Sequence, residues 1–193
     1  MSTDEVVALL AAHRAVVDRV SGELAGKINE IAEAVLETLE AGGKLLFVGN
    51  GGSAADAQHL AAEYMIRFKS NREALPAIAL TTDTSLLTAG ASDLGFDRVY
   101  ARQVQALARP GDLLLIHSTS GEPQSLIGAA DAARQAGAGT VALLAKGGGD
   151  LKSRVDLAVV VPTDSTARAQ EMHITIGHIV CELVDRSFAE REG

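Results

Sequence analysis

LLFVGNGGSAADAQHLAAE, residues 45–63, joins a wholly apolar run to a glycine-rich turn and then to a helical pattern. A short apolar run that ends in such a turn is typical of a strand buried on both faces of a parallel sheet. Similar runs and helical patterns alternate along the rest of the chain, which predicts an α/β fold with a five-stranded parallel sheet between helices. The other expected strands are 76–81, 112–118, 140–145 and 156–162, and the expected helices are 84–91, 97–108, 123–136 and 165–189.

The segment before the first strand is helical in pattern over residues 3–41, because apolar side chains recur at helical spacing. Ser21-Gly22 predicts a break there into two N-terminal helices. We expect residues 1–193 to form one domain, with residues 1–42 as a helical extension. That extension should pack on the core or on a neighbouring subunit.

Composition argues against several classes of partner. Lys and Arg number 17 against 25 Asp and Glu, a formal charge of −8, which disfavours nucleic acid and anionic membranes. No apolar run approaches the roughly 18 residues of a membrane span. The single cysteine, Cys181, excludes an intrachain disulfide and a cysteine-rich zinc site. We therefore expect a cytoplasmic protein without nucleic-acid or membrane partners.

Glycine and hydroxyl residues follow two of the expected strands, at the sheet edge where open parallel sheets bind ligands. Gly49, Gly51 and Gly52 allow backbone N–H groups to approach an anion at a helix start, although a plain strand-to-helix turn is the alternative. The spacing matches neither the dinucleotide fingerprint nor the Walker loop. STSG at 118–121 offers three hydroxyls, of which helix capping explains one. With few basic residues nearby, these loops favour a small sugar phosphate.

Two pairs of polar residues lie on the helices that carry or follow these loops. His59 and Glu63 are four residues apart, on one helix face, and could bind a metal, act as an acid/base couple or form a plain surface pair. Glu63 is about 15 Å along the helix axis from Ser53, so it could reach the site across a subunit boundary or beside a sugar chain. Gln170 and His178 are about 12 Å apart on one straight helix. They could share a metal only if Gln170 precedes the helix or if they come from different chains, and a buried structural histidine is the alternative for His178.

GNGGSAADAQH (49–59), TTDTS (81–85), STSG (118–121) and QEMHITIGHIV (170–180) together resemble the bacterial phosphoheptose isomerases, members of the sugar isomerase (SIS) fold. The resemblance covers nearly the whole chain. It implies a flavodoxin-like, three-layer fold with a five-stranded parallel sheet between helices. It also implies a homotetramer with active sites at subunit interfaces. It also implies an aldose–ketose isomerase that converts sedoheptulose 7-phosphate to D-glycero-D-manno-heptose 7-phosphate, the first step toward activated heptose.

The resemblance also implies roles for individual residues. Glu63 matches the catalytic base and His178 its acid/base partner. One zinc ion per subunit is implied, with ligands matching His59, Glu63, Gln170 and His178. Besides Glu63, the implied substrate contacts are Asn50, Gly51, Gly52, Ser53, Ser92, Asp93, Ser118, Thr119, Ser120 and Gln170.

Two departures from the family pattern affect the substrate prediction. Ser92 stands where the family usually has Asn before the acid, Asp93. Pro123 stands where a phosphate-binding Ser is usual, and Pro offers neither a hydroxyl nor an N–H. Glu122 adds a negative charge beside the expected phosphate, and Ser125 compensates only in part. A related phosphosugar or a weaker phosphate affinity is therefore an open alternative.

Two non-catalytic functions compete with the isomerase. A sister branch of the same fold binds a replication initiator protein, and other SIS modules sense phosphosugars to regulate transcription. Glu63 and His178 favour the enzyme, because a pure binding protein has no need of both. The chain carries no basic DNA-binding segment that would favour the sensor.

Overall fold

Alternation of apolar strands and helices produces a three-layer α/β structure in the computed structural model, which describes residues 1–192. All five expected strands are present. In chain order the elements are α1 (Thr3–Glu40), β1 (Leu45–Gly49), α2 (Gly52–Met65), β2 (Ala77–Ala79), α3 (Thr84–Leu94), η1 (Phe96–Arg98), α4 (Val99–Leu107), β3 (Leu113–His117), α5 (Gln124–Gln135), β4 (Gly139–Leu144), η2 (Asp150–Ser153), β5 (Leu157–Val160) and α6 (Thr166–Glu192).

The sheet is parallel throughout, with the strand order β2-β1-β3-β4-β5. This is the flavodoxin-like order, in which ligands bind at the carboxyl edge between the strands on either side of the switch point, here β1 and β3. Gly49 at the end of β1 pairs with His117 at the end of β3. The register therefore places the loops that follow these two strands next to each other.

Two apolar cores form because successive side chains of a strand point to opposite faces. Phe47 and Leu115 face the layer that contains α1, α2 and α6. Val48 and Ile116 face the layer that contains α4 and α5. Every residue of β1 and β3 is buried, which explains why these strands read as unbroken apolar runs.

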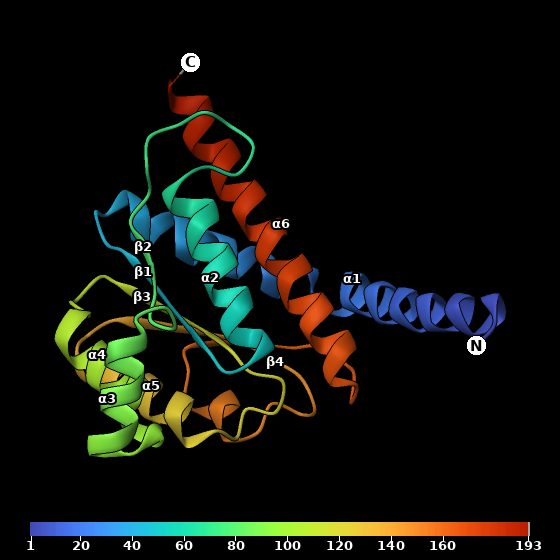
Figure 1. Cartoon of the computed structure of the whole chain (residues 1–193). Helices are drawn as coiled ribbons and strands as arrows, with labels where there is room; N and C mark the ends of the chain where they lie inside the picture. The colour runs from blue at the N-terminus through green and yellow to red at the C-terminus, as the bar shows by residue number, and fades with distance from the viewer. Residues whose placement is uncertain (193) are drawn as a thin grey trace.

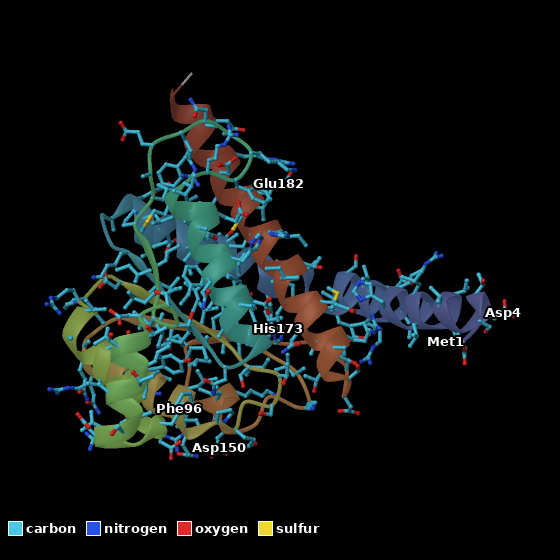
Figure 2. The ribbon with its side chains drawn as sticks, in the orientation of Figure 1. Met1, Asp4, Phe96, Asp150, His173 and Glu182 are labelled. Atoms are coloured by element: carbon cyan, nitrogen blue, oxygen red, sulfur yellow. The ribbon has the colours of Figure 1, made fainter. Side chains whose placement is uncertain are left out.

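The expected break at Ser21-Gly22 is wrong, because α1 is one continuous helix. Ser2 and Glu5 form a capping box that begins it. Gly22 lies on the exposed face, and apolar contacts on both sides of it outweigh its weak helix propensity of about 1 kcal/mol. The first turns of α1 project away from the body, as the labelled Met1 and Asp4 show in Figure 2.

Helices α2 and α6 lie side by side and run in the same direction (Figure 1). Contacts between their side chains keep one register, from the side chain of Gln170 beside Gly52 to Leu60 beside Gly177. This register decides which polar residues of the two helices can meet. Among the described residues, no helix has the length and hydropathy to cross a bilayer.

Candidate active site

The glycine turn after β1 brings backbone N–H groups and a helix start to the carboxyl edge of the sheet. Gly51 has φ +58°, a conformation that favours glycine, and it is the N-cap of α2 without any side-chain cap. Asn50 donates a hydrogen bond from Nδ2 to Oγ of Ser125, 3.1 Å away on α5. This bond joins the turn to the element that follows the STSG loop.

Gly52 makes room for the side chain of Gln170. A Cβ atom at position 52 would lie 2.7 Å from Nε2 of Gln170, closer than such atoms approach in real proteins. The start of α2 and the first turns of α6 therefore meet at this point. Two expected substrate residues, one from each end of the sequence, are brought into contact.

Gly52→Ala is expected to displace Gln170 and to raise KM for the substrate at least fivefold, because the added methyl group occupies the space of the amide. Gly22→Ala is the matched control, since an added Cβ at position 22 meets no atom within 4 Å. The control should gain up to about 1 kcal/mol of stability from better helix propensity and keep its kinetics. Steady-state kinetics on both variants test this. Unchanged KM in Gly52→Ala would contradict the assignment of Gln170.

The STSG loop uses two of its hydroxyls to hold its own turn. Oγ of Ser118 accepts the N–H of Gly121 at 3.0 Å, and Oγ of Ser120 accepts the N–H of Glu122 at 3.3 Å. Bonds within the turn thus account for two of the three hydroxyls, and the expectation that one of them caps the following helix is wrong, because the N-cap of α5 is Pro123 and has no side-chain cap. Each accepting oxygen still carries its own O–H, which can donate to an anion.

The residues after STSG lie beside a second glycine-rich loop, Gly147–Gly149, which follows β4. Pro123 is the N-cap of α5 and provides no side-chain cap, so the helix start keeps free N–H groups. The exposed Glu122 directs Oε1 at Gly149, where an added Cβ would lie 2.5 Å from that oxygen. Ser125 is buried and accepts the bond from Asn50. The negative charge of Glu122 therefore lies beside the glycine loop.

Three polar side chains of α2 and α6 converge two to three turns beyond the helix starts. Nε2 of His59 lies 2.8 Å from Nε2 of His178 and 3.4 Å from Oε1 of Glu63. One ligand atom of each residue lies within 4.8 Å of the other two. Phe68 stacks against His178 at 5.6 Å between ring centroids. We call His59, Glu63 and His178 the His–Glu–His cluster.

The His–Glu–His cluster remains open to solvent on one side. The side chain of His59 is 49% exposed and that of Glu63 is 20% exposed. Gln170 does not join the cluster within one chain, because it lies in α6 and contacts Gly52, about 10 Å along the helix axis from His59. The four implied zinc ligands therefore do not converge in the single chain.

Ser92 and Asp93 are exposed on α3, at the opposite side of the molecule from α6 in Figure 1. No residue of α3 is buried. Within one chain the structure does not bring these two residues to the His–Glu–His cluster.

Asp56 is a polar residue of this region that the sequence analysis missed. It lies on α2 between Gly52 and His59, on the face that carries both. Burial raises the pKa of Asp56 to about 6, and the nearby His59 lowers it in part. Oδ2 of Asp56 is buried and finds no hydrogen-bond partner among the described residues. The sequence feature that could have identified Asp56 is its position three residues before His59, on the same helical face.

The donor set of the His–Glu–His cluster fits a zinc ion. Zinc holds nitrogen and oxygen ligands at about 2.0–2.2 Å in a tetrahedron, which separates neighbouring ligand atoms by about 3.3 Å. The three atoms, within 4.8 Å of one another, need only small side-chain shifts to reach that spacing. A fourth ligand would have to come from water, substrate or another chain.

Comparisons with known proteins agree with this architecture. Residues 9–145 match the model of the SIS domain family. The phosphoheptose isomerase of Roseiflexus sp. (strain RS-1) is 58% identical over 160 residues, 83% of this chain and 81% of that protein. The phosphoheptose isomerase of Geotalea uraniireducens is 50% identical over 95% of this chain and 97% of its own length.

Solved structures lead to the same family. The phosphoheptose isomerase of Neisseria gonorrhoeae superposes with a TM-score of 0.89 at 40% identity, over 95% of this chain and 98% of that one. That of Francisella tularensis gives a TM-score of 0.92 at 33% identity, over 96% and 100% of the two chains. The chain therefore belongs to the SIS domain family and, within it, to the phosphoheptose isomerases, which are enzymes.

Proposed function

We propose that the enzyme converts sedoheptulose 7-phosphate to D-glycero-D-manno-heptose 7-phosphate through an enediol, as the first step of activated heptose biosynthesis. The observation that carries the proposal is the meeting of Glu63 on α2 with His178 on α6 in the His–Glu–His cluster. Isomerisation of a ketose needs a base for a carbon-bound proton and an acid/base for the oxygens, and this pair supplies both.

Two proton transfers convert the ketose to the enediol, and two more convert the enediol to the aldose. The Glu63 carboxylate removes a proton from C1 of the open-chain ketose while His178 gives a proton to the oxygen on C2. His178 then removes the proton of the C1 hydroxyl, and Glu63 returns its proton to C2, which yields the aldose. Carboxylate and imidazole both finish the cycle in their starting states.

Zinc is proposed as the resident metal, with His59, Glu63 and His178 as its ligands in this chain and Gln170 as a ligand from another chain. When bound, zinc would supply Lewis-acid stabilisation of the charge that develops on the sugar oxygens. Without the metal, the contact between Nε2 of His59 and Nε2 of His178 at 2.8 Å orients the imidazole of His178. Metal analysis of the purified protein tests this assignment.

The substrate phosphate is proposed to bind at the loops after β1 and β3. Donors there are the N–H groups at the start of α2 and the hydroxyls of Ser118, Thr119 and Ser120. Asn50 and Ser53 lie on the same edge and would contact the sugar. Neutral donors suit a monoester anion without a bound magnesium ion.

A homotetramer with active sites between subunits is proposed because three parts of the site are incomplete in one chain. The His–Glu–His cluster is open on one side, Gln170 lies two turns from it, and Ser92-Asp93 are exposed on α3, away from the cluster. Apolar side chains of the projecting part of α1 are exposed, among them Val6, Leu9 and Leu10. A groove between α1 and α6 adds further apolar surface, lined in part by Ile179 and Leu183. We also propose a cytoplasmic location.

Leu10→Glu is expected to dissociate the assembly and to lower activity at least tenfold, because it places a charge on the apolar face of α1. Gln135→Glu adds the same charge to the exposed end of α5 and should leave both properties unchanged. Light scattering after size-exclusion chromatography measures the mass, and activity is read on the same fractions. A wild-type monomer with full activity would refute the shared site.

Incubation of the enzyme with sedoheptulose 7-phosphate tests the proposed function. Mass-coupled chromatography should detect an aldose heptose phosphate that is absent without enzyme. Five- and six-carbon ketose phosphates, run in parallel, test the alternative opened by Pro123 and Glu122. Faster turnover of a five- or six-carbon ketose phosphate would make that sugar the substrate instead. Inactivity on every sugar, sedoheptulose 7-phosphate included, would refute the proposed function.

A further inference from the structure

A buried ion pair lies at the far end of the contact between α2 and α6. Nε of Arg72 donates to Oδ1 of Asp185 at 2.9 Å, and the two side chains are only 2% and 3% exposed. Arg72 belongs to the loop after α2, whereas Asp185 lies on α6, two turns beyond His178. Removal of two charges from water costs free energy that their attraction only partly returns, so a buried pair such as this one contributes little net stability.

Other donors of Arg72 bind the end of the helix that carries the proposed base, and Nη1 also donates to the carbonyl of Glu73 at 2.9 Å. Nη2 donates to the backbone carbonyl of Glu63 and Nη1 to that of Tyr64, both at 2.9 Å. Helix α2 has no basic residue in its last turn, and its C-cap, Ile66, satisfies only the carbonyl of Ala62. Arg72 thus provides a donor to the carbonyl of Glu63, shares the carbonyl of Tyr64 with the N–H of Leu75, and adds positive charge at this helix end.

Asp185 binds the same loop from the side of α6. Its Oδ2 accepts the N–H of Ser70 at 2.8 Å and that of Lys69 at 3.4 Å. One carboxylate therefore holds both the backbone of the loop and the guanidinium that caps α2. The result is a direct polar connection between the peptide group of Glu63 and the helix that carries His178.

We propose that Arg72 and Asp185 are positioning residues that set the placement of the Glu63 carboxylate relative to the His178 imidazole. This inference rests on the proposed function, in which those two groups move protons on the same substrate. The planar fork of arginine suits this task, because it binds one carboxylate and two carbonyls at fixed angles, which a lysine cannot do. A misplacement of about 1 Å between such groups can cost about 100-fold in rate.

The test compares Asp185→Asn with Asp112→Asn, a change just before β3. Asp112 is a matched control, because it is also buried, binds one cation and accepts two backbone N–H groups, those of Lys44 and Arg109. At a temperature where urea titration shows each variant folded, Asp185→Asn should lower kcat at least tenfold with KM within threefold. Asp112→Asn should lose stability without a change in kcat greater than twofold.

Arg72→Lys is the second variant, since it keeps the charge and removes the fork. It should lower kcat at least threefold. Binding of Co²⁺ to the metal-free protein, followed by visible absorption, is a readout independent of turnover. Asp185→Asn and Arg72→Lys should each bind Co²⁺ at least fivefold more weakly than wild type. Asp112→Asn should bind Co²⁺ with wild-type affinity.

Several results would overturn the positioning role. The first is a kcat and a Co²⁺ affinity equal to those of wild type in folded Asp185→Asn and Arg72→Lys. The second is a loss of kcat and Co²⁺ affinity in Asp112→Asn as large as in the ion-pair variants. The others are failure of both ion-pair variants to fold at 10 °C, and a wild type with neither activity nor Co²⁺ binding. If wild type binds Co²⁺ but does not isomerise the heptulose phosphate, the proposed function fails. The Co²⁺ affinities of the variants then still decide the positioning role.

Discussion

Glu63→Gln is expected to lower kcat about 1,000-fold while substrate affinity stays within about threefold, as general-base catalysis of this kind contributes roughly 10²–10⁴-fold. The amide has nearly the shape of the carboxylate but cannot take a proton from carbon. Helix α2 should keep its fold, because Glu63 lies on its partly exposed face. Stopped-assay kinetics with sedoheptulose 7-phosphate and isothermal titration of the variant measure the two quantities.

Glu33→Gln is the control for this substitution. Glu33 is also a helical glutamate and accepts a side-chain bond from Asn29, but it is exposed on α1. Its kinetics should match wild type. Metal content is measured on both variants, because Glu63 is also a proposed zinc ligand. A Glu63→Gln enzyme with normal kcat would show that another group removes the proton.

Acid is expected to destabilise the fold by about 3 kcal/mol between pH 7 and pH 5. Burial lowers the pKa of His117 to about 3, with a smaller contribution from neighbouring His173, and burial lowers the pKa of His173 to about 4 although its bond to the Leu144 carbonyl opposes this. The two rings lie 6.2 Å apart at the end of β3 and the start of α6, and Figure 2 labels His173.

The sign of this pH effect follows from where the protons bind. Both histidines are neutral when folded, whereas the unfolded chain takes up protons below about pH 6.5. Stability is therefore full above pH 6.5 and is lost as the pH falls toward 4. Asp56, whose pKa is raised, acts in the opposite direction and offsets part of the loss.

Urea denaturation followed by circular dichroism at pH 7, 6 and 5 measures the acid effect. His117→Leu should flatten the pH dependence by about half, because it removes one of the two titrating rings. Met172→Leu, a change of a buried apolar side chain of α6 that does not titrate, should leave the slope unaltered. A wild-type stability that stays constant or rises from pH 7 to pH 5 would show that the buried rings are not neutral in the fold.

The sheet could be predicted from the sequence because parallel strands are buried on both faces and so appear as unbroken apolar runs. Strands β1, β2, β3 and β5 fall inside the expected segments, and β4 begins one residue early, at Gly139. The false break at Ser21-Gly22 has a physical cause. Local propensity argued for a break, but the packing of α1 along the body, which local propensity does not encode, decided the outcome.

From local patterns alone, the candidate site was predictable only where its residues share one helix or one loop, and the resemblance to the phosphoheptose isomerases added His178 to Glu63. His59 and Glu63 appear from their spacing of four, and the STSG loop from its composition. The proximity of His59 and Glu63 to His178 depends on the register of α2 against α6, which no local pattern reveals. The Arg72–Asp185 pair, formed between residues 113 positions apart, was invisible for the same reason.

Proton transfer between neighbouring sugar carbons is the central claim, and ¹H NMR of the reaction in D₂O tests it most directly. Because Glu63 is partly exposed, the proton it carries should exchange with solvent before it is returned. The account predicts an aldose heptose phosphate with deuterium at C2, formed by wild type and not by Glu63→Gln. An aldose that carries only protium at C2, or no aldose at all, would contradict it.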